Sequence, residues 1–230
     1  MKIYNNDALI KRNKQIGMVS ALLAPVLMLV GAQFITTSRE GLLISLALIV
    51  VAFILFQIGI ALRKFGQGGE IRFAEALKKL DNTYSLFNFV SPAGHLLVGP
   101  TGIWILIPRF VRGTLTYNPK RRRWVVLRKS TLNKVLGPLF GSIGRPEFDL
   151  ANDAEALDLF LQKHWEHEAS PHIQGAIVVM NDEGDVDAKD APVPAVHLGK
   201  LRAYIRQHEG KSQMSSGTLK QFTDLLIPSE

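Results

Sequence analysis

Two long uncharged apolar segments near the start of the chain dominate its hydrophobic pattern. Residues 16–35 and 42–62 contain no Lys, Arg, Asp or Glu, and neither shows a polar face. As an α-helix, each segment of about 20 residues matches a hydrocarbon core roughly 30 Å thick. A helix on the surface of a soluble domain would keep polar residues along one side. The pattern therefore predicts a hairpin of two membrane-spanning helices, joined by the short connection TTSREG.

The first apolar segment also has some features of a cleaved signal peptide, since it contains Pro25 and several small residues. The second segment follows at once, which favours the hairpin, although cleavage of the first stays open. Ser20, Ala24 and Gly31 form a stripe of small residues at helical spacing. Such a stripe lets two membrane helices pack closely, and no ionisable residue within either span offers an ion pathway. The hairpin is expected to act as an anchor.

The cations around the two segments predict their orientation. The connecting loop contains a single cation, Arg39, beside Glu40, whereas six cations flank the other ends of the segments: Lys2, Lys11, Arg12, Lys14, Arg63 and Lys64. Positive residues stay on the cytoplasmic side of a membrane. We therefore expect a multi-pass protein of a prokaryotic inner membrane, with both termini in the cytoplasm.

After the two spans the pattern alternates between helical and strand periodicity. Period-2 or continuous apolar runs predict strands at residues 84–90, 95–98, 103–107, 113–117, 124–127, 173–180 and 193–197. Helical periodicity predicts helices at residues 70–80, 154–165, 198–207 and 218–227, whereas residues 130–150 read as irregular and residues 181–190 as an acidic loop. This order predicts an α/β domain with a mixed sheet flanked by helices. The expected organisation is residues 1–15, a cytoplasmic N-terminal segment; 16–64, the hairpin; 65–212, the main domain; and 213–230, a C-terminal helix.

Composition adds two constraints to this picture. The 230 residues include no cysteine, which excludes a disulfide scaffold, a Cys-ligated metal site and a thiol nucleophile. The net charge of +7 comes mostly from the flanks of the spans, but residues 109–145 contain ten cations and no acid, and residues 146–190 contain twelve acids. The basic segment could attract anionic lipid or nucleic acid, or the two segments could neutralise one another.

The run GGE…GHLLVGPTGIWILIPR…G resembles the NERD (nuclease-related) domain. Gly69-Glu70 matches the Gly-Glu pair that opens the family's first helix, and His95 matches its histidine at the start of a strand. Residues 99–102 match the turn, and Gly113 matches the trailing glycine. The resemblance covers roughly residues 66–210 and implies a restriction-endonuclease-like fold with a PD-(D/E)xK type of active site.

The chain departs from this family at the residues that carry the chemistry. The family has an Asp where this chain has Gly94, and it has Glu-x-Lys where this chain has Ile107, Pro108 and Arg109. Only Glu70 remains of the acids that would hold Mg²⁺, and a single carboxylate binds this ion weakly. An arginine cannot be deprotonated to act as a base. The resemblance therefore implies a degenerate site without metal or cofactor, and Pro108 is expected to end its strand.

The expected function is that of a catalytically inactive NERD-like domain that binds or scaffolds at a membrane. Its expected contact surface for anionic lipid head groups or a protein partner is the basic set Lys120, Arg121, Arg122, Arg123, Arg128, Lys129 and Lys134. The alternatives are a nucleic-acid-binding protein or residual metal-dependent nuclease, and a purely structural subunit of a larger membrane complex. The sequence names no ligand, partner or oligomeric state.

Overall fold

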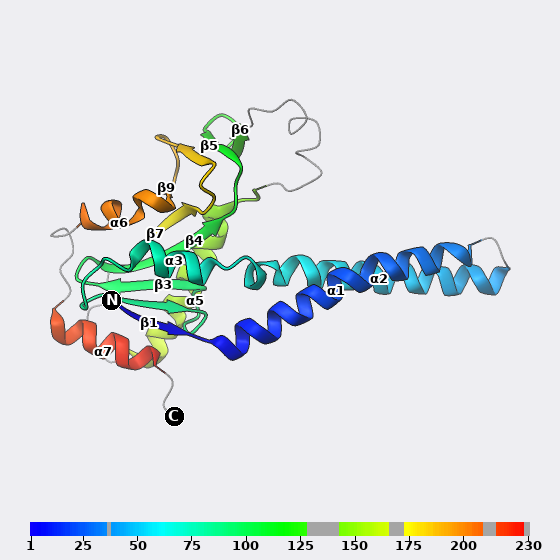
Figure 1. Ribbon diagram of the computed structural model, residues 1–230, viewed down its shortest axis with the longest axis horizontal. Coiled ribbons are helices and arrows are strands. Elements are labelled where there is room, and N and C mark those ends of the chain that lie inside the picture. Colours follow the sequence, from blue (N-terminus) through cyan, green and yellow to red (C-terminus); the bar gives the residue numbers. More distant parts are fainter. Residues whose placement is uncertain (36–37, 128–142, 166–172, 209–214, 228–230) are drawn as a thin grey trace. The chain divides into compact units, whose positions relative to one another are not determined.

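The computed structural model describes residues 1–35, 38–127, 143–165, 173–208 and 215–227 (Figure 1). Arg128, Lys129 and Lys134, three members of the expected basic surface, lie outside these ranges. The chain forms two compact units, one made of residues 6–69 and the other of residues 1–5 with 70–230.

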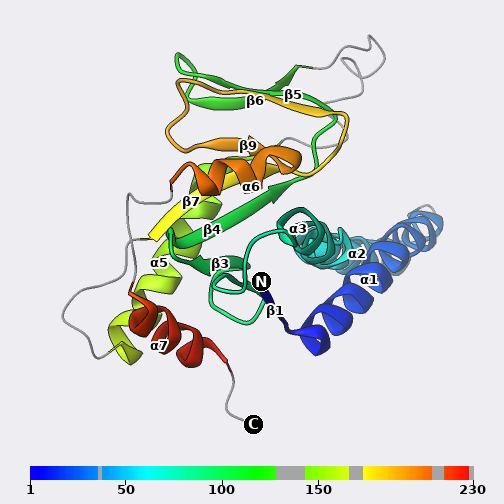
Figure 2. The same cartoon turned by 60° about the vertical axis from the view of Figure 1, so that its left-hand side comes forward.

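The smaller unit is a helical hairpin. Helix α1 (Asp7–Gln33) begins after Asn6, whose side chain accepts a hydrogen bond from the Leu9 N–H. Helix α2 (Arg39–Gly66) begins after Ser38, whose hydroxyl accepts from the Gly41 N–H at 3.0 Å. Such caps satisfy backbone donors that have no partner within the helix. The two helices run side by side over most of their length (Figures 1 and 2).

Small residues form the interface of this hairpin. The expected stripe is confirmed, since Ser20, Ala24 and Gly31 are all buried. A Cβ atom placed at Gly31 would lie 3.3 Å from the Leu48 Cβ, so the glycine allows the close approach of α2. Both helices are long and apolar enough to cross a membrane. Within the most apolar 18-residue stretch of each, only 22% (α1) and 11% (α2) is buried. Helices in the core of a soluble protein would be mostly buried.

The larger unit is built on a six-stranded mixed sheet with strand order β1-β2-β3-β4-β7-β9. Its strands are β1 (Lys2–Asn5), β2 (Ser85–Asn88), β3 (His95–Gly99), β4 (Gly102–Arg109), β7 (Ile173–Val179) and β9 (Ala195–His197). The central strands β3 and β4 form the predicted antiparallel hairpin, with Leu96 opposite Ile105. Strands β4 and β7 pair in parallel, as do β1 and β2.

Helices cover both faces of this sheet, which confirms the expected α/β layering (Figure 2). Helices α3 (Gly69–Leu77) and α6 (Leu198–Arg206) pack on one face through a cluster that includes Phe73, Trp104 and Ile205. Helices α5 (Pro146–His164) and α7 (Ser216–Leu226) pack on the other through Leu157, Ile105 and Phe222. Apolar side chains alternate between the two clusters along β4, because successive residues of a strand face opposite sides.

A second, three-stranded sheet has the order β6-β5-β8. Its strands are β5 (Gly113–Asn118), β6 (Arg123–Leu127) and β8 (Gly184–Asp187). Leu115 of β5 and Trp124 of β6 are buried in a third apolar cluster together with Ile177 and Val179 of β7. This cluster joins the small sheet to the large one.

Four features differ from the expectations drawn from sequence. Residues 2–5, grouped with the segment before the first span, form strand β1. Residues 184–187, expected in an acidic loop, form strand β8, which pairs with β5. Helix α5 begins at Pro146, within the segment expected to be irregular. Strand β4 continues through Pro108, which lies opposite Val178 of β7, so the expected strand end was wrong.

The sheet tolerates Pro108 because of the side to which this residue's backbone points. The Arg109 carbonyl accepts a hydrogen bond from the Met180 N–H, so the backbone of Arg109 faces β7. Adjacent residues of a strand point their backbone groups to opposite sides, so Pro108 faces the side of β3. The pairing between β3 and β4 ends at Leu96 and Ile105, so Pro108 lies beyond the last paired residues. No hydrogen bond of this strand pair therefore needs the N–H that proline lacks.

Candidate functional site

Glu70, the acid that the resemblance retains, lies in the first turn of α3. Apolar packing of Phe73 and Leu77 holds this helix on the sheet. In addition, Arg72 donates to the Met180 carbonyl at 2.7 Å, and the Phe73 ring centroid lies 5.0 Å from that of His95. The Glu70 Oε2 atom is buried and accepts no hydrogen bond from the described residues. A carboxylate at a helix start is favoured by the helix dipole, which gives Glu70 a structural role independent of any ligand.

Gly94 lies immediately before β3, where the family has an Asp. Its N–H donates to the Asp153 Oδ2 on α5 at 3.1 Å, and its carbonyl accepts from the Phe89 N–H at 2.8 Å. A Cβ at Gly94 would lie 3.8 Å from the same Asp153 oxygen, an ordinary contact distance. Asp153 therefore brings a carboxylate from α5 beside the start of β3.

Ile107 and Arg109, which the resemblance aligns with the Glu and Lys of the family's motif, both lie on β4. Ile107 is 4% exposed and packs in the apolar cluster below α5, so this position offers no metal ligand. The Arg109 guanidinium forms an ion pair with Asp149 of α5 and donates to the Pro108 carbonyl at 3.0 Å. Arg109 is thus tied to a helix beside the strand rather than directed to an open site.

Together these four positions lack the chemistry of a divalent-metal site. The β3–β4 pairing ends at Leu96 and Ile105, short of Gly94 and Ile107, and neither of these two residues has a carboxylate. In the described part of the chain, no three His, Asp or Glu side chains gather as a metal centre would need. Mg²⁺ prefers several oxygen ligands, which this arrangement does not supply.

His95 belongs to a polar network inside the sheet. Its Nδ1 lies 2.8 Å from the Asn88 Oδ1, and the Asn88 amide donates to the Asn5 Oδ1 at 2.8 Å. Because a carboxamide oxygen only accepts, Nδ1 of His95 carries the proton in this pair. Phe73 and Phe89 pack against the His95 ring on two sides. The network connects three neighbouring strands, and Asn5 brings the N-terminal strand into it.

The basic surface is centred on the turn between β5 and β6. Lys120, Arg121, Arg122 and Arg123 are all exposed, and none forms one of the ion pairs found between described residues. The Asn118 side chain accepts from the Arg121 N–H at 3.1 Å, and Arg122 adopts a left-handed φ of 47°. This tight turn presents four consecutive cations to solvent.

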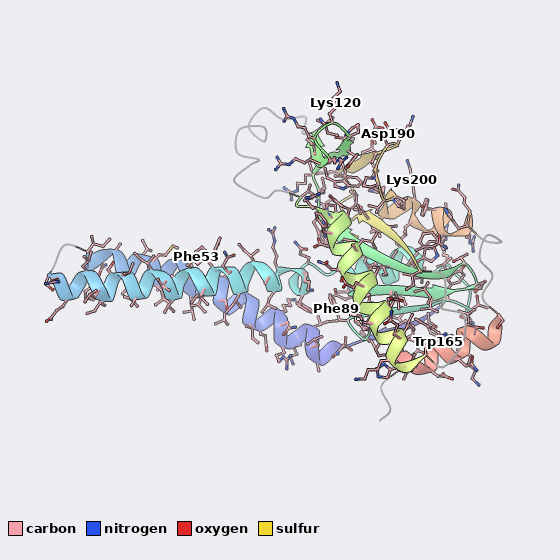
Figure 3. The ribbon with its side chains drawn as sticks, turned by 180° about the vertical axis from the view of Figure 1, so that it is seen from behind. Phe53, Phe89, Lys120, Trp165, Asp190 and Lys200 are labelled. Atoms are coloured by element: carbon pink, nitrogen blue, oxygen red, sulfur yellow. The ribbon has the colours of Figure 1, made fainter. Side chains whose placement is uncertain are left out.

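Acidic residues lie in the same small sheet as this basic turn. Strand β8 pairs with β5 and contributes Asp185 and Asp187, which are exposed. Lys120 and Asp190 lie at the same end of the larger unit (Figure 3). Acidic and basic residues therefore lie near one another, but none of the four cations of the turn forms an ion pair with a described acid. An external anion could bind these cations.

Sequence reasoning missed Asp149 and Asp153, the two acids of α5 that contact the candidate site. Both fall near the start of a helix whose first turns were taken as irregular. Pro146 at the first helical position, followed by Glu147 and Asp149 in the first turn, was the signal that could have identified this start. The spacing of four residues then places both acids on one helix face.

Comparison with known proteins adds no assignment to this site. No family model, curated protein or solved structure matches the chain.

Proposed function

We propose that the chain is a membrane-anchored binding or scaffolding module, with a NERD-like cytoplasmic domain that does not cleave phosphodiesters. The observation that carries the proposal is the exposed apolar surface of the helical hairpin. Leu22, Leu29 and Leu43 are at least 64% exposed, and most of the other exposed large apolar residues lie in the same two helices. An apolar surface of this extent needs a partner or a bilayer to cover it.

The cation distribution supports the cytoplasmic placement of the larger unit. Lys14 and Arg63 stand at the ends of the helices that adjoin the larger unit in sequence, whereas the opposite end has Arg39 beside Glu40. By the positive-inside rule, both termini would then lie in the cytoplasm of a prokaryotic cell.

The candidate site supports binding rather than catalysis. A buried Ile107 and a Gly94 whose N–H is taken by Asp153 leave Glu70 without the second and third ligands of a metal site. The exposed cations of the β5–β6 turn instead suit an anionic surface. Each cation close to an anionic bilayer contributes about 1 kcal/mol.

A fluorescence experiment tests the contact of this turn with lipid. Since the chain has no cysteine, Lys120→Cys gives a single thiol for a fluorophore in the full-length protein, reconstituted with a quencher-bearing lipid. We expect quenching to increase with the fraction of anionic lipid and to fall at high salt. Reversal of Arg121, Arg122 and Arg123 to Glu should abolish the increase. The matched control reverses three exposed lysines elsewhere, Lys163, Lys200 and Lys220, and quenching equal in both triple variants would refute the role of the turn.

A nucleic-acid function is the second candidate, favoured by the buried Oε2 of Glu70 and by the carboxylate that Asp153 brings to Gly94. Its test is a plasmid-nicking assay with Mg²⁺ or Mn²⁺ and a Glu70→Gln control. Metal-dependent nicking that this substitution abolishes would overturn the non-catalytic proposal. DNA retention that falls steeply with salt would support binding without cleavage.

A further inference from the structure

The helical hairpin has a groove on its surface, of about 510 Å³, near the start of α1 and the end of α2. The residues that line it all belong to the helical unit and are mostly small or apolar, with the cations Lys14 and Arg63 among them. Pockets of this size hold ligands with tens of atoms. In Figures 1 and 2 the two helices separate toward the start of α1, which is the region of the groove.

Small residues create the groove by bringing the helices together beneath larger side chains. A Cβ at Gly17 would lie 3.0 Å from the Leu62 Cβ, and one at Gly59 would lie 3.3 Å from the Ala21 Cβ. Large apolar side chains flank this close crossing, and Met18 and Phe56 are 58% and 49% exposed. The floor is therefore backbone and small side chains, and the walls are flexible or aromatic apolar groups.

One end of the groove is cationic. Lys14 is two residues before the first apolar segment, and Arg63 follows the second directly. Antiparallel packing, with Gly17 against Leu62, brings both cations to the same end of the hairpin. Both side chains are exposed, and neither forms an ion pair with a described residue. The groove thus joins an apolar trough to two cations that form no ion pair with a described residue.

We infer that this groove binds one anionic phospholipid, with the phosphate at Lys14 and Arg63 and an acyl chain along the apolar trough. The inference rests on the proposed membrane insertion of the hairpin. Charge and position along the bilayer normal both favour this occupant. The cations lie just outside the apolar segments, at the level of the lipid head groups, and the trough extends from them along the apolar segments. Basic pockets between membrane helices on the cytoplasmic side are suited to anionic head groups.

A protein helix is a poorer occupant than a lipid. The cations stand at one end only, and the large exposed side chains that surround the trough are aliphatic or aromatic. Gly66 lines the groove, and a Cβ there would meet nothing within 4 Å, so this end is open enough for a head group.

The test is native mass spectrometry of the full-length chain released from a mild detergent after incubation with two lipids. Dioleoyl phosphatidylglycerol and dioleoyl phosphatidylcholine have the same acyl chains, so any difference between them reports the head group. We expect one phosphatidylglycerol per chain to be retained several-fold more than phosphatidylcholine. The double variant Lys14→Gln/Arg63→Gln should lose this preference. The matched control, Arg12→Gln/Lys64→Gln, removes two exposed cations that do not line the groove and should keep it.

A second variant tests the open space at the cationic end of the groove. Gly66→Phe adds bulk where the structure has open space, and it should reduce the retention of both lipids while the helices stay packed. Equal retention of the two lipids by the wild-type chain, or equal loss in the groove and control variants, would overturn the inference. Flotation of each variant with neutral vesicles separates the two proposals, because failure of the wild-type chain to float would overturn membrane insertion itself.

Discussion

Replacement of Asn88 by alanine should destabilise the larger unit strongly, because this side chain connects three strands. Asn88 is fully buried, and its carboxamide contacts His95 Nδ1 and Asn5 Oδ1, each at 2.8 Å. Loss of the first contact leaves the buried Nδ1–H of His95 without this acceptor, at a cost of about 1–3 kcal/mol. Loss of the second, at an exposed asparagine, costs about 0.5–1.5 kcal/mol. The expected decrease in the free energy of unfolding is therefore about 2–4 kcal/mol.

Two assays on the full-length chain in mild detergent separate these contributions. Urea unfolding, followed by tryptophan fluorescence, reports the full decrease. Hydrogen exchange of the β1 amides reports local opening of the N-terminal strand, which breaks only the second of these two contacts, the one to Asn5. It should accelerate about 2- to 13-fold, since 1.4 kcal/mol corresponds to a factor of ten.

The variant Asn5→Ala provides the control. It should reproduce the faster exchange of β1 with a small effect on global unfolding, and it should cost almost nothing in the Asn88→Ala background. Amides of α1 belong to the other unit and should be unaffected. Additive effects of the two substitutions, or a decrease below about 0.5 kcal/mol for Asn88→Ala, would refute the role assigned to the network.

Three further predictions follow from single contacts. Gly99→Ala places a Cβ about 2.1 Å from the Tyr84 ring and should lower the free energy of unfolding by about 1–3 kcal/mol, measured as a shift of the urea midpoint. Burial raises the pKa of Tyr204 above its ordinary value of 10.0, which favours the neutral phenol in the folded state. This contribution to the free energy of unfolding is complete below pH 10.0 and should be lost as the pH rises through the raised pKa of the folded state. Tyr204→Phe should remove this component of the fall, as measured by urea unfolding between about pH 9 and 12. Asp149→Asn removes the ion pair with Arg109. Because the Asp149 side chain is 57% exposed, this change should cost at most about 1 kcal/mol, so a larger loss would mean that Asp149 has a further partner.

Most of the core elements could be predicted from sequence because their periodicity is local. The run from Ile173 to Val179 is nearly continuously apolar, and the structure buries its second half: Val178 packs under α3 and α6, and Ile177 and Val179 pack against the small sheet. The β3–β4 hairpin is marked by its Gly-Pro-Thr-Gly turn, in which Gly102 has a φ of 106°. A positive φ of this kind requires glycine.

The strands that were missed depend on partners distant in sequence. Lys2–Asn5 is short and mostly exposed, and it becomes a strand only by pairing with Ser85–Asn88. Gly184–Asp187 has the composition of a turn, since Gly and Asp are disfavoured in strands, but β5 imposes extended pairing on it. Local propensity contains no information about such neighbours.

The candidate site was only partly accessible to sequence reasoning. The absence of acids at Gly94 and Ile107 could be read directly from the resemblance to the NERD family. The carboxylates of Asp149 and Asp153 could not, because they reach the site through the packing of α5 against β4. A contact between a helix and a strand about 40 residues apart is a property of the tertiary fold.

The most direct test of the account is the membrane topology of the hairpin. Because the chain has no cysteine, Ser38→Cys and Asp190→Cys each give one thiol, in the connection and in the larger unit respectively. In intact cells, a membrane-impermeant maleimide that crosses the outer membrane should label the first variant and spare the second, and lysis should make both reactive. Labelling of Asp190→Cys in intact cells, or recovery of the full-length chain in the soluble fraction, would contradict a cytoplasmic domain anchored by two spans.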